Sequence, residues 1–503
     1  MKTLAKKIRL RYTGLVMFTS RVISLLTGLA FVTMVARNVS LIEYGAWQYV
    51  SLLVSYFLFP NCIINYWVTR QIARQLKVAK TSLTMNLVFS LMGCLVLLSV
   101  SPYAAKTVNS DPLLFMIGSV TLLAMYSVAS LEAVAQGSIP QINAYGFLVL
   151  QAMKVILGVV MILYMKTGIY GAFVSVLAAN IAEAIFLFAN LRSYVTKANL
   201  DWSTAKNWLR TSWIPLYSGL APILISLDAL IVTLLTSSTE PIALWKAALM
   251  ISQVVGYSSL LTYALYPKLL AGGTEKDVET SLKLVLMFAV PSAIGAVLLA
   301  EPLIQIFKSE FIIASNILRI SVITTFLACI GGILETIIVG TEKIDTKDAS
   351  FKKLLKSRLF LLPTLNYAKL LMYLPIICVT TIAIINLQAE PVYLNIALAC
   401  NIIALVAYVP IIAYMYILAQ KILPFHFPMA SLGKHLLASV AIVAIATTLY
   451  PRGAIQTITL VAISALAYFL ILYAIDKDTR DLVSQVISTL KTGHEKSSAL
   501  GNI

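Results

Sequence analysis

Residues 12–48 read YTGLVMFTSRVISLLTGLAFVTMVARNVSLIEYGAWQ, an apolar run followed by a short polar turn. From Gly14 to Ala36 the only charged residue is Arg21. As an α-helix this run is roughly 35 Å long, at about 1.5 Å per residue. That length is enough to cross a hydrocarbon core of about 30 Å. We therefore expect a transmembrane helix here, with an arginine inside it that must face protein or water.

The composition of the whole chain excludes a soluble globular protein. Of its 503 residues, 60% are hydrophobic and only 12% are charged, whereas soluble domains carry about 25% charged residues. The apolar runs recur from end to end, so the sequence predicts an all-α polytopic membrane protein. The three histidines are scattered, and the cysteines form no C-x-x-C pair, so we expect buried thiols and neither a metal site nor a cofactor. These cysteines are Cys62, Cys94, Cys329, Cys378 and Cys400.

Runs of about 17 or more nearly uncharged residues predict about fourteen transmembrane helices. Their ranges are 14–36, 46–69, 82–103, 112–136, 144–165, 168–191, 213–236, 241–266, 282–300, 310–340, 362–388, 391–419, 434–450 and 454–475.

The loops between these ranges predict the orientation. If the N-terminus is cytoplasmic, the inner segments hold 28 of the 38 Lys and Arg residues, the outer loops hold 5 and the spans hold 5. This asymmetry follows the positive-inside rule and predicts that both termini are cytoplasmic. The net charge of +17 then reflects topology and attraction to anionic lipid, and no nucleic-acid partner is needed to explain it. In the longest inner loop, 341–358, the second half has the apolar spacing of a helix lying on the membrane surface.

A weak internal repeat predicts the domain organisation. The motif from Glu43 to Trp47 opens the second span, and a similar motif from Glu240 to Trp245 opens the eighth. Six spans per repeat give parallel repeats related by an axis along the membrane normal. We expect two six-helix lobes around a central cavity, with two further helices appended. The predicted segments are 1–195 (spans 1–6), 196–425 (spans 7–12), 426–476 (spans 13 and 14) and a cytoplasmic tail, 477–503.

Several of these pieces together resemble a known family. They are the basic N-terminus, Ala36-Arg37 followed by Glu43-Tyr44-Gly45, the segment Arg70-Gln-Ile-Ala-Arg74, and Phe311-Ile-Ile-Ala-Ser-Asn-Ile-Leu-Arg319. With the fourteen-span layout, the sequence resembles the Wzx-type polysaccharide and lipid-linked oligosaccharide flippases. These belong to the multidrug/oligosaccharidyl-lipid/polysaccharide (MOP) exporter superfamily.

The resemblance implies a transporter and not an enzyme. Two lobes would alternate access to the cavity and flip a polyprenyl- or dolichyl-(di)phosphate-linked oligosaccharide from the cytoplasmic to the outer leaflet, for cell-surface polysaccharide or glycoprotein assembly. The expected location is the cell membrane of a prokaryote, bacterial or archaeal. Its partners would be the lipid-linked substrate, the bilayer and a coupling H⁺ or Na⁺; no protein partner is evident. The glycan, the number of phosphates, the coupling ion and the oligomeric state are left open.

Three cations within spans are candidate ligands for the substrate phosphate. Arg21 lies about 10 Å into its span, Lys154 lies near the middle of the fifth span, and Lys246 lies about a turn into the eighth. A cation about 4 Å from a phosphate gains on the order of 4 kcal/mol at an effective dielectric of about 20. A structural ion pair is the alternative for each, as is snorkelling for Lys246.

Acidic residues within spans are candidates for coupling-ion binding or for ion pairs with those cations. They are Glu132, Glu183 and Asp228, of which Asp228 is the favoured coupling residue, with Glu335 near an inner helix end. Arg70 and Arg74 are weak candidates for a cytoplasmic gate. Arg319 and Lys369 are expected to snorkel.

Two other classes remain as alternatives. A cation-coupled drug or small-molecule antiporter of the same superfamily would share the fold, although the span cations favour a flippase. A membrane glycosyltransferase or polymerase would need an acid pair in a long outer loop, and the outer loops are short. No G-x-x-x-x-G-K-[ST] motif occurs, which disfavours an ATP-driven exporter.

Overall fold

The computed structural model describes residues 10–262, 265–270, 272–342, 357–451 and 453–481. Within these ranges every regular element is a helix. Contacts between Cα atoms divide the chain into two compact units. The first unit is Met1–Ala247 with Phe360–Ile403, and the second is Ala248–Leu359 with Ala404–Ile503. Each unit is described by itself.

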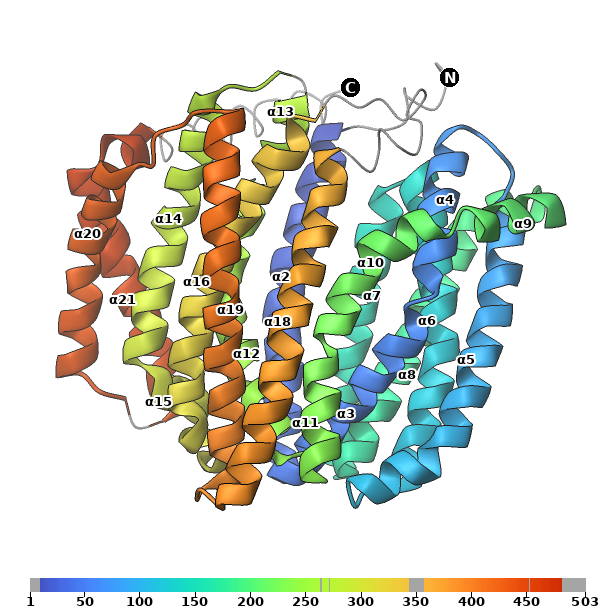
Figure 1. The fold of residues 1–503 in the computed structure, drawn as a ribbon, viewed down its shortest axis with the longest axis horizontal. Coiled ribbons are helices and arrows are strands. Elements are labelled where there is room, and N and C mark those ends of the chain that lie inside the picture. The colour runs from blue at the N-terminus through green and yellow to red at the C-terminus, as the bar shows by residue number, and fades with distance from the viewer. Residues whose placement is uncertain (1–9, 263–264, 271, 343–356, 452, 482–503) are drawn as a thin grey trace, which may run out of the picture. The chain divides into compact units, whose positions relative to one another are not determined.

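The helices of the first half of the chain follow one another with short connections (Figure 1). They are α2 (Leu10–Asn38), α3 (Leu41–Leu58), α4 (Asn61–Ala73), α5 (Ala79–Thr107), α6 (Pro112–Ser138), α7 (Gln141–Gly158) with the π-helical turn η1 (Val159–Tyr164), α8 (Gly168–Thr196), α9 (Trp202–Arg210), α10 (Trp213–Ile225) and α11 (Leu227–Thr236).

The second half combines long helices with several short ones. They are α12 (Glu240–Gly256), the 3₁₀ turn η2 (Tyr257–Thr262), α13 (Leu265–Leu270), α14 (Glu275–Leu298), α15 (Ala300–Gln305), η3 (Ser309–Ala314), α16 (Ser315–Gly340), α18 (Arg358–Leu387), α19 (Val392–Ile422), α20 (Met429–Thr448) and α21 (Ala454–Ile475).

Each of the fourteen predicted spans overlaps helical residues, so the all-helical class is confirmed. Among the described residues, 11 helices are long and apolar enough to cross a membrane, or 12 when α3 and α4 count as one span bent by 55°. The bend falls at Pro60, where a proline removes a backbone donor and kinks the helix. The count of fourteen spans and the cytoplasmic termini stay predictions.

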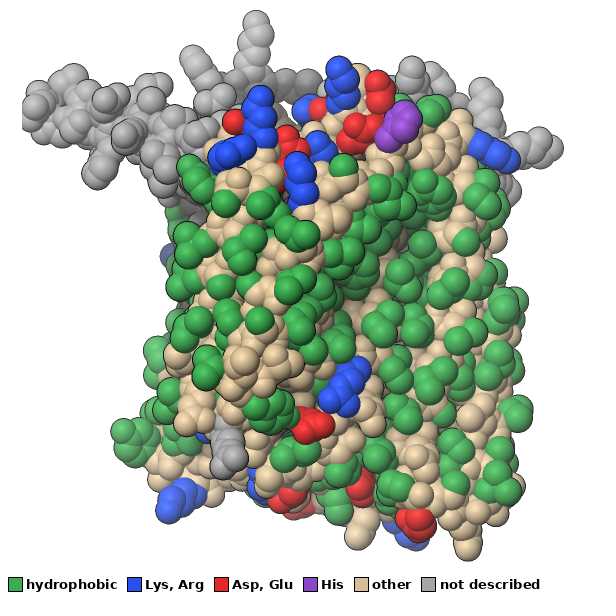
Figure 2. All heavy atoms as spheres, turned by 90° about the vertical axis from the view of Figure 1, so that its left-hand side faces the viewer, with side chains coloured by type: hydrophobic (Ala, Val, Ile, Leu, Met, Phe, Trp, Pro, Cys, Tyr) green, Lys and Arg blue, Asp and Glu red, His purple; other side chains and the backbone are tan. Residues whose placement is uncertain are grey.

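The outer faces of the helices carry the large apolar side chains expected of lipid-facing surfaces. On α21, Ile455 is 82% exposed and Leu470 71% exposed, and on α18 Leu371 is 73% exposed. Figure 2 shows one such face: hydrophobic side chains cover its middle, and charged side chains gather mainly at its two ends. Because water cannot hydrate charges in a hydrocarbon core, this distribution fits a membrane-spanning body.

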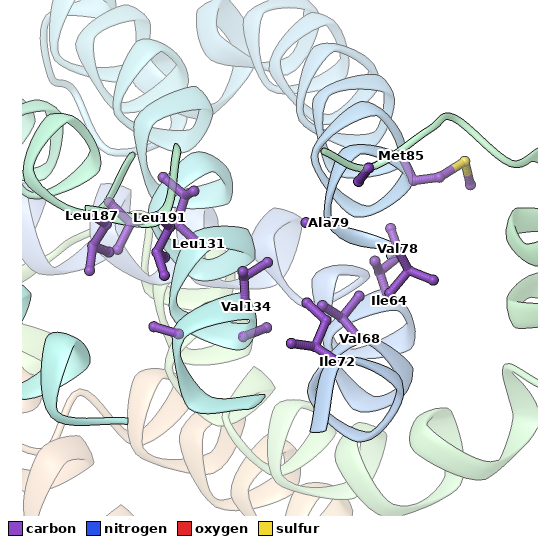
Figure 3. Close-up of a cluster of buried hydrophobic side chains, with 14 of the residues drawn as sticks. Ile64, Val68, Ile72, Val78, Ala79, Met85, Leu131, Val134, Leu187 and Leu191 are labelled. Atoms are coloured by element: carbon purple, nitrogen blue, oxygen red, sulfur yellow. The ribbon is translucent and has the colours of Figure 1, made fainter. Parts of the chain in front are cut away.

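The core of the first unit lies where α4, α5, α6 and α8 meet. Ile64 and Val68 of α4, Val134 of α6 and Leu187 of α8 are fully buried there (Figure 3). Trp208 of α9 belongs to the same cluster and is 1% exposed. The cluster therefore fixes the helices that carry several of the candidate residues.

Helix α9 was not predicted, since its sequence was interpreted as part of an inner loop. It contacts α4 and α5 and lies across the end of α5 (Figure 1). The side chain of Asp201 caps its N-terminus, and hydrogen bonds from Thr204 and Ser203 lower the pKa of Asp201 to about 2. The signal was present as the pair Ala205 and Trp208, three residues apart and therefore on one helix face. The surface helix predicted in 341–358 falls mainly outside the described residues.

The predicted segments, with boundaries at residues 195 and 425, stay predictions, because the two compact units divide the chain by contacts and do not test the lobes. Helices α10, α11 and α18 belong to the first unit. Helices α20 and α21 belong to the second unit, where α20 packs on α14 and α21 packs on α20. The two-lobe arrangement and its cavity stay predictions.

Candidate functional site in the first unit

One buried cluster brings together two of the predicted residues, Asp228 of α11 and Lys246 of α12. Asp228 is only 6% exposed. Its Oδ2 accepts a hydrogen bond of 2.7 Å from the Tyr373 hydroxyl, and its Oδ1 accepts one from the backbone N–H of Ala229. Lys246 is half-buried and interacts electrostatically with Asp228. The carboxylate is therefore held by fixed partners from two helices.

A second lysine in this cluster contradicts the expectation from the sequence. Lys369 of α18 was expected to snorkel, but it interacts electrostatically with Asp228. Its Nζ also lies 5.8 Å from the centroid of the Tyr373 ring, which is itself 1% exposed. Two lysines thus share one carboxylate in a protein interior, a place where charges are costly unless they are compensated. We call Asp228, Lys246, Lys369 and Tyr373 the lysine cluster.

Helices α2 and α7 carry the other two candidate cations. Gln151 donates a hydrogen bond of 3.2 Å to the hydroxyl of Ser24. Lys154, one turn further along α7, is half-buried, and its Nζ lies 5.4 Å from the centroid of the buried Phe31 ring. Arg21 lies on α2 one turn before Ser24, but its side chain is outside the described side chains. The backbone therefore places Arg21 and Lys154 within a few turns of each other along one helix pair.

A polar cavity lies among α4, α6 and α10, and two further candidates line it. Its volume is about 500 Å³. Arg70 lines it from α4, with its guanidinium carbon 3.6 Å from the centroid of the Tyr66 ring, and Glu132 lines it from α6. A stacked guanidinium keeps the edge of its fork available for hydrogen bonds. The remaining lining residues are Cys62, Asn65, Thr69, Ala129, Ala133, Gln136, Pro215 and Gly219.

Arg74, the other gate candidate, is exposed and follows the last residue of α4, outside this cavity. Asparagine side chains join the helices around the cavity. Asn65 donates to the carbonyl of Ala129 at 2.8 Å, and Asn143 of α7 donates to the carbonyl of Glu132 at 2.9 Å. These bonds hold α4, α6 and α7 in register, because a buried amide must satisfy its donors.

Glu183 of α8 lies against Gly146 of α7, where an added Cβ would be 3.3 Å from its Oε1. It is 1% exposed, and its Oε1 has no hydrogen-bond partner among the described residues. The carboxylates of Glu132 and Glu183 interact electrostatically. Sequence reasoning grouped Glu132, Glu183 and Asp228 as candidate acids, but the environments of two of them differ. Both carboxylate oxygens of Asp228 accept hydrogen bonds, whereas Oε1 of Glu183 has no hydrogen-bond partner among the described residues.

The residues that carried the family resemblance mostly have structural contacts. Glu43 forms a capping box with Ser40 at the start of α3, where its Oε2 accepts a bond of 2.7 Å from the Ser40 N–H. Gly45 packs against Thr239, whose hydroxyl donates to the carbonyl of Ile42 at 3.0 Å. Arg319 of α16 pairs with Glu301 at 3.4 Å. Most residues of the family motifs therefore contribute to helix capping and helix packing.

Among the described residues, no group of three or more His, Cys, Asp or Glu side chains is arranged to hold a metal ion. The residues that sequence reasoning missed are Lys369, Tyr373 and Tyr66. Lys369 and Tyr373 lie well over a hundred residues from Asp228 in sequence, and no local pattern connects them.

Comparisons with known proteins agree on the architecture. No family model matches the sequence, and no curated protein matches it. Among solved structures, the lipid II flippase MurJ in an inward closed conformation has a TM-score of 0.68 at 13% identity, covering 93% of this chain and 100% of that chain. An inward-facing multidrug resistance MATE family transporter of the MOP superfamily has a TM-score of 0.56 at 13% identity, covering 81% of this chain and 98% of that one.

A mutant of the Vibrio cholerae MATE transporter VcmN has a TM-score of 0.51 at 14% identity, covering 84% of this chain and 97% of that one. The chain thus has the fold of a polytopic membrane protein, which it shares with these three solved structures. More specifically, it is the fold of the MOP superfamily, which confirms at the level of fold what the sequence motifs indicated. The matching structures named here are flippases and transporters, not enzymes.

Proposed function

We propose that this protein flips an anionic lipid that carries an oligosaccharide, a polyprenyl- or dolichyl-(di)phosphate-linked glycan, from the cytoplasmic to the outer leaflet of a prokaryotic cell membrane. The observation that carries the proposal is the lysine cluster, in which Lys246 and Lys369 both interact electrostatically with Asp228. Their ammonium groups supply two cations for a phosphate to contact. The likeness of the fold to that of a lipid II flippase supports the proposal.

The expected binding energy of the phosphate suits a transporter, which must bind its substrate and also release it. A phosphate about 4 Å from one lysine gains on the order of 4 kcal/mol at an effective dielectric of about 20. Asp228 weakens that gain by competing for the same ammonium groups, so the substrate is concentrated without being trapped. Arg21 and Lys154 would contact the phosphate at another stage of the cycle. Both termini would be cytoplasmic, and the basic inner segments would attract anionic lipid headgroups.

The direct test is movement of a labelled polyprenyl-diphosphate oligosaccharide across the bilayer of proteoliposomes that contain the full chain. Wild type is expected to move it, and Lys246→Gln is expected to lower the rate about tenfold or more, because tenfold requires losing only about 1.4 kcal/mol. Arg21→Ala is expected to act in the same direction.

Lys308→Gln is the matched control, because Lys308 forms a local ion pair of 2.7 Å with Glu310 outside the cluster. Equal transport rates for Lys246→Gln and Lys308→Gln would show that the lysine cluster has no role in moving the lipid. If wild type moves no lipid-linked sugar but exchanges an organic cation for protons, the protein is an antiporter and the flippase proposal is wrong.

A further inference from the structure

Three helices of the second unit enclose a polar pocket that the proposed function does not use. Helices α14, α20 and α21 run side by side (Figure 1). The wall of the pocket comes from the first turns of α14, the first turns of α20 and the residues just after α21. Its volume is about 210 Å³, far more than the roughly 30 Å³ that one water molecule takes up in the liquid. The pocket therefore has room for a small polar group.

His435 of α20 lines this pocket, and one of its ring nitrogens has no partner. The residue is 2% exposed, and its Nδ1 lies 3.3 Å from the hydroxyl oxygen of Tyr468. Its Nε2 is buried and has no hydrogen-bond partner among the described residues. Buried polar atoms without a partner are costly and rare in folded proteins. A bound group that pairs with Nε2 would remove this cost.

The contacts of Tyr468 decide which kind of partner Nε2 needs. The Tyr468 hydroxyl donates its single proton to the backbone carbonyl of Met287 at 2.8 Å. Its oxygen can then only accept a hydrogen bond from Nδ1 of His435, so the ring proton lies on Nδ1. In the neutral imidazole the other nitrogen, Nε2, is consequently an acceptor. The missing partner is therefore a hydrogen-bond donor.

The charges in the wall favour a cation over an anion. The charged residues that line the pocket are Lys283, Asp476, Asp478 and Asp481. Lys283 pairs with Asp478 at 2.6 Å, and Lys434 pairs with Asp476 at 2.9 Å. Carboxylates thus outnumber the ammonium groups, and a donor that also carries positive charge complements both the wall and Nε2.

A metal ion does not fit this position. Among the described residues, no group of His, Cys, Asp and Glu side chains is arranged to hold one. Both oxygens of Asp476 already accept hydrogen bonds, Oδ1 from Lys434 and Oδ2 from the backbone N–H and the hydroxyl of Thr479. A cation with N–H bonds fits better, because it donates to Nε2 without displacing these bonds.

The position of the pocket suits a lipid headgroup. Further along α20 from the pocket, the apolar residues Leu437 and Val440 are exposed, as expected of a helix that faces lipid. The pocket lies at the end of these helices, and Figure 2 shows that charged side chains gather mainly at the ends of such a face. The headgroup of an ethanolamine phospholipid presents a primary ammonium group at this depth.

We propose that this pocket binds a primary ammonium group, which donates one N–H to Nε2 of His435 while Asp476 and Asp478 compensate its charge. Its position favours the headgroup of an ethanolamine phospholipid as the source, and free ethanolamine offers the same chemistry. The bound group joins α14, α20 and α21 at one end. This inference goes beyond the proposed function and does not depend on it.

The test compares lipids that differ only in the number of N–H bonds. The melting temperature of the purified full chain in detergent is recorded as one phospholipid is added, with the acyl chains kept the same. The four lipids are phosphatidylethanolamine, its N-methyl and N,N-dimethyl forms, and phosphatidylcholine. A ligand that binds only the folded state raises the melting temperature as its concentration rises.

Wild type is expected to show a saturable rise with the first three lipids and none with phosphatidylcholine, because a quaternary ammonium has no N–H to donate. Free ethanolamine, added in a second arm, distinguishes the sources. A rise with the lipids alone identifies a headgroup, and a rise with free ethanolamine alone identifies a soluble amine.

Three variants assign the response to His435. His435→Phe keeps an aromatic ring and removes the acceptor, so it is expected to lose the preference for phosphatidylethanolamine over phosphatidylcholine. His435→Gln keeps an acceptor and should retain part of the response, which keeps the test usable if the phenylalanine variant fails to fold. His426→Phe is the matched control, because the His426 side chain is 99% exposed and lies outside the pocket. It should respond like wild type.

Equal shifts with phosphatidylethanolamine and phosphatidylcholine, no shift in either arm, or an unchanged response in His435→Phe would overturn the inference. No lipid-linked sugar is used in this test. Failure of the flippase proposal therefore leaves its result unaffected.

Discussion

Gly45 shows how closely two segments distant in sequence approach each other in this fold. A Cβ at this position would lie 2.3 Å from the carbonyl oxygen of Thr239, a backbone atom that cannot move aside cheaply. Small residues allow such close helix contacts in membranes. The glycine of the Glu-Tyr-Gly motif is therefore required by packing.

We expect Gly45→Ala to destabilise the protein by about 1–3 kcal/mol through overpacking, measured as a lower melting temperature in detergent. Gly28→Ala is the control. Among the described residues, no atom outside the neighbouring residues and the local helix backbone lies within 4 Å of the added methyl group. Alanine is also the better helix former, so this variant should melt at or slightly above the wild-type temperature. Equal effects of both substitutions would contradict the close contact.

The candidate residues show what sequence could and could not predict at this scale. Charges within apolar runs are visible in sequence, so Lys246, Asp228 and Glu183 were identified as functional candidates. Their partners were not, because the Tyr373 hydroxyl and Asp228 are brought together by tertiary packing across 145 positions. Hydropathy cannot distinguish a bonded carboxylate from one without a partner.

At the scale of elements, α9 is a short amphipathic helix that packs against α4 and α5. Its buried side holds Trp208, whose Nε1 donates a hydrogen bond of 3.2 Å to Gln71. Its other side presents Trp202, which is 59% exposed. The two tryptophans of one short helix thus have different environments, the protein core and the exposed surface. We expect the exposed indole to lie at a membrane interface, where such rings are enriched.

We expect Trp208→Ala to cost about 3 kcal/mol or more, because it empties a buried aromatic site and leaves Gln71 without its donor. Trp202→Ala should leave the melting temperature nearly unchanged. Melting curves of both variants in detergent decide this, and a larger loss for Trp202→Ala would mean that α9 does not pack as described.

Elements of this kind explain the limits of the sequence prediction. Long apolar runs predicted the spans well, since a membrane imposes both their length and their composition. The break at Pro60 and the short helix α9 were missed. Two helices joined by a bend still form one continuous apolar run in the sequence. A nine-residue amphipathic helix is too short to be detected with a hydropathy window.

For the whole molecule, the distribution of 28 inner and 5 outer basic residues is a topological prediction that can be checked directly. In a background with the five native cysteines replaced, Lys106→Cys is expected to react with a membrane-impermeant maleimide in intact cells. Lys197→Cys is expected to react only after permeabilisation. The reverse result would show that the protein has the opposite orientation in the membrane. Reaction of both positions in intact cells would show that the number of spans between them is wrong.

The contact between Thr239 and the start of α3 has a consequence for biosynthesis. The Thr239 hydroxyl reaches a carbonyl 197 positions earlier in the chain. At about 5–20 residues per second, the ribosome needs roughly 10–40 s to make the intervening segment. During that interval the N-terminal helices reside in the bilayer without one of their packing partners, and a chaperone or the insertion machinery has time to act on them.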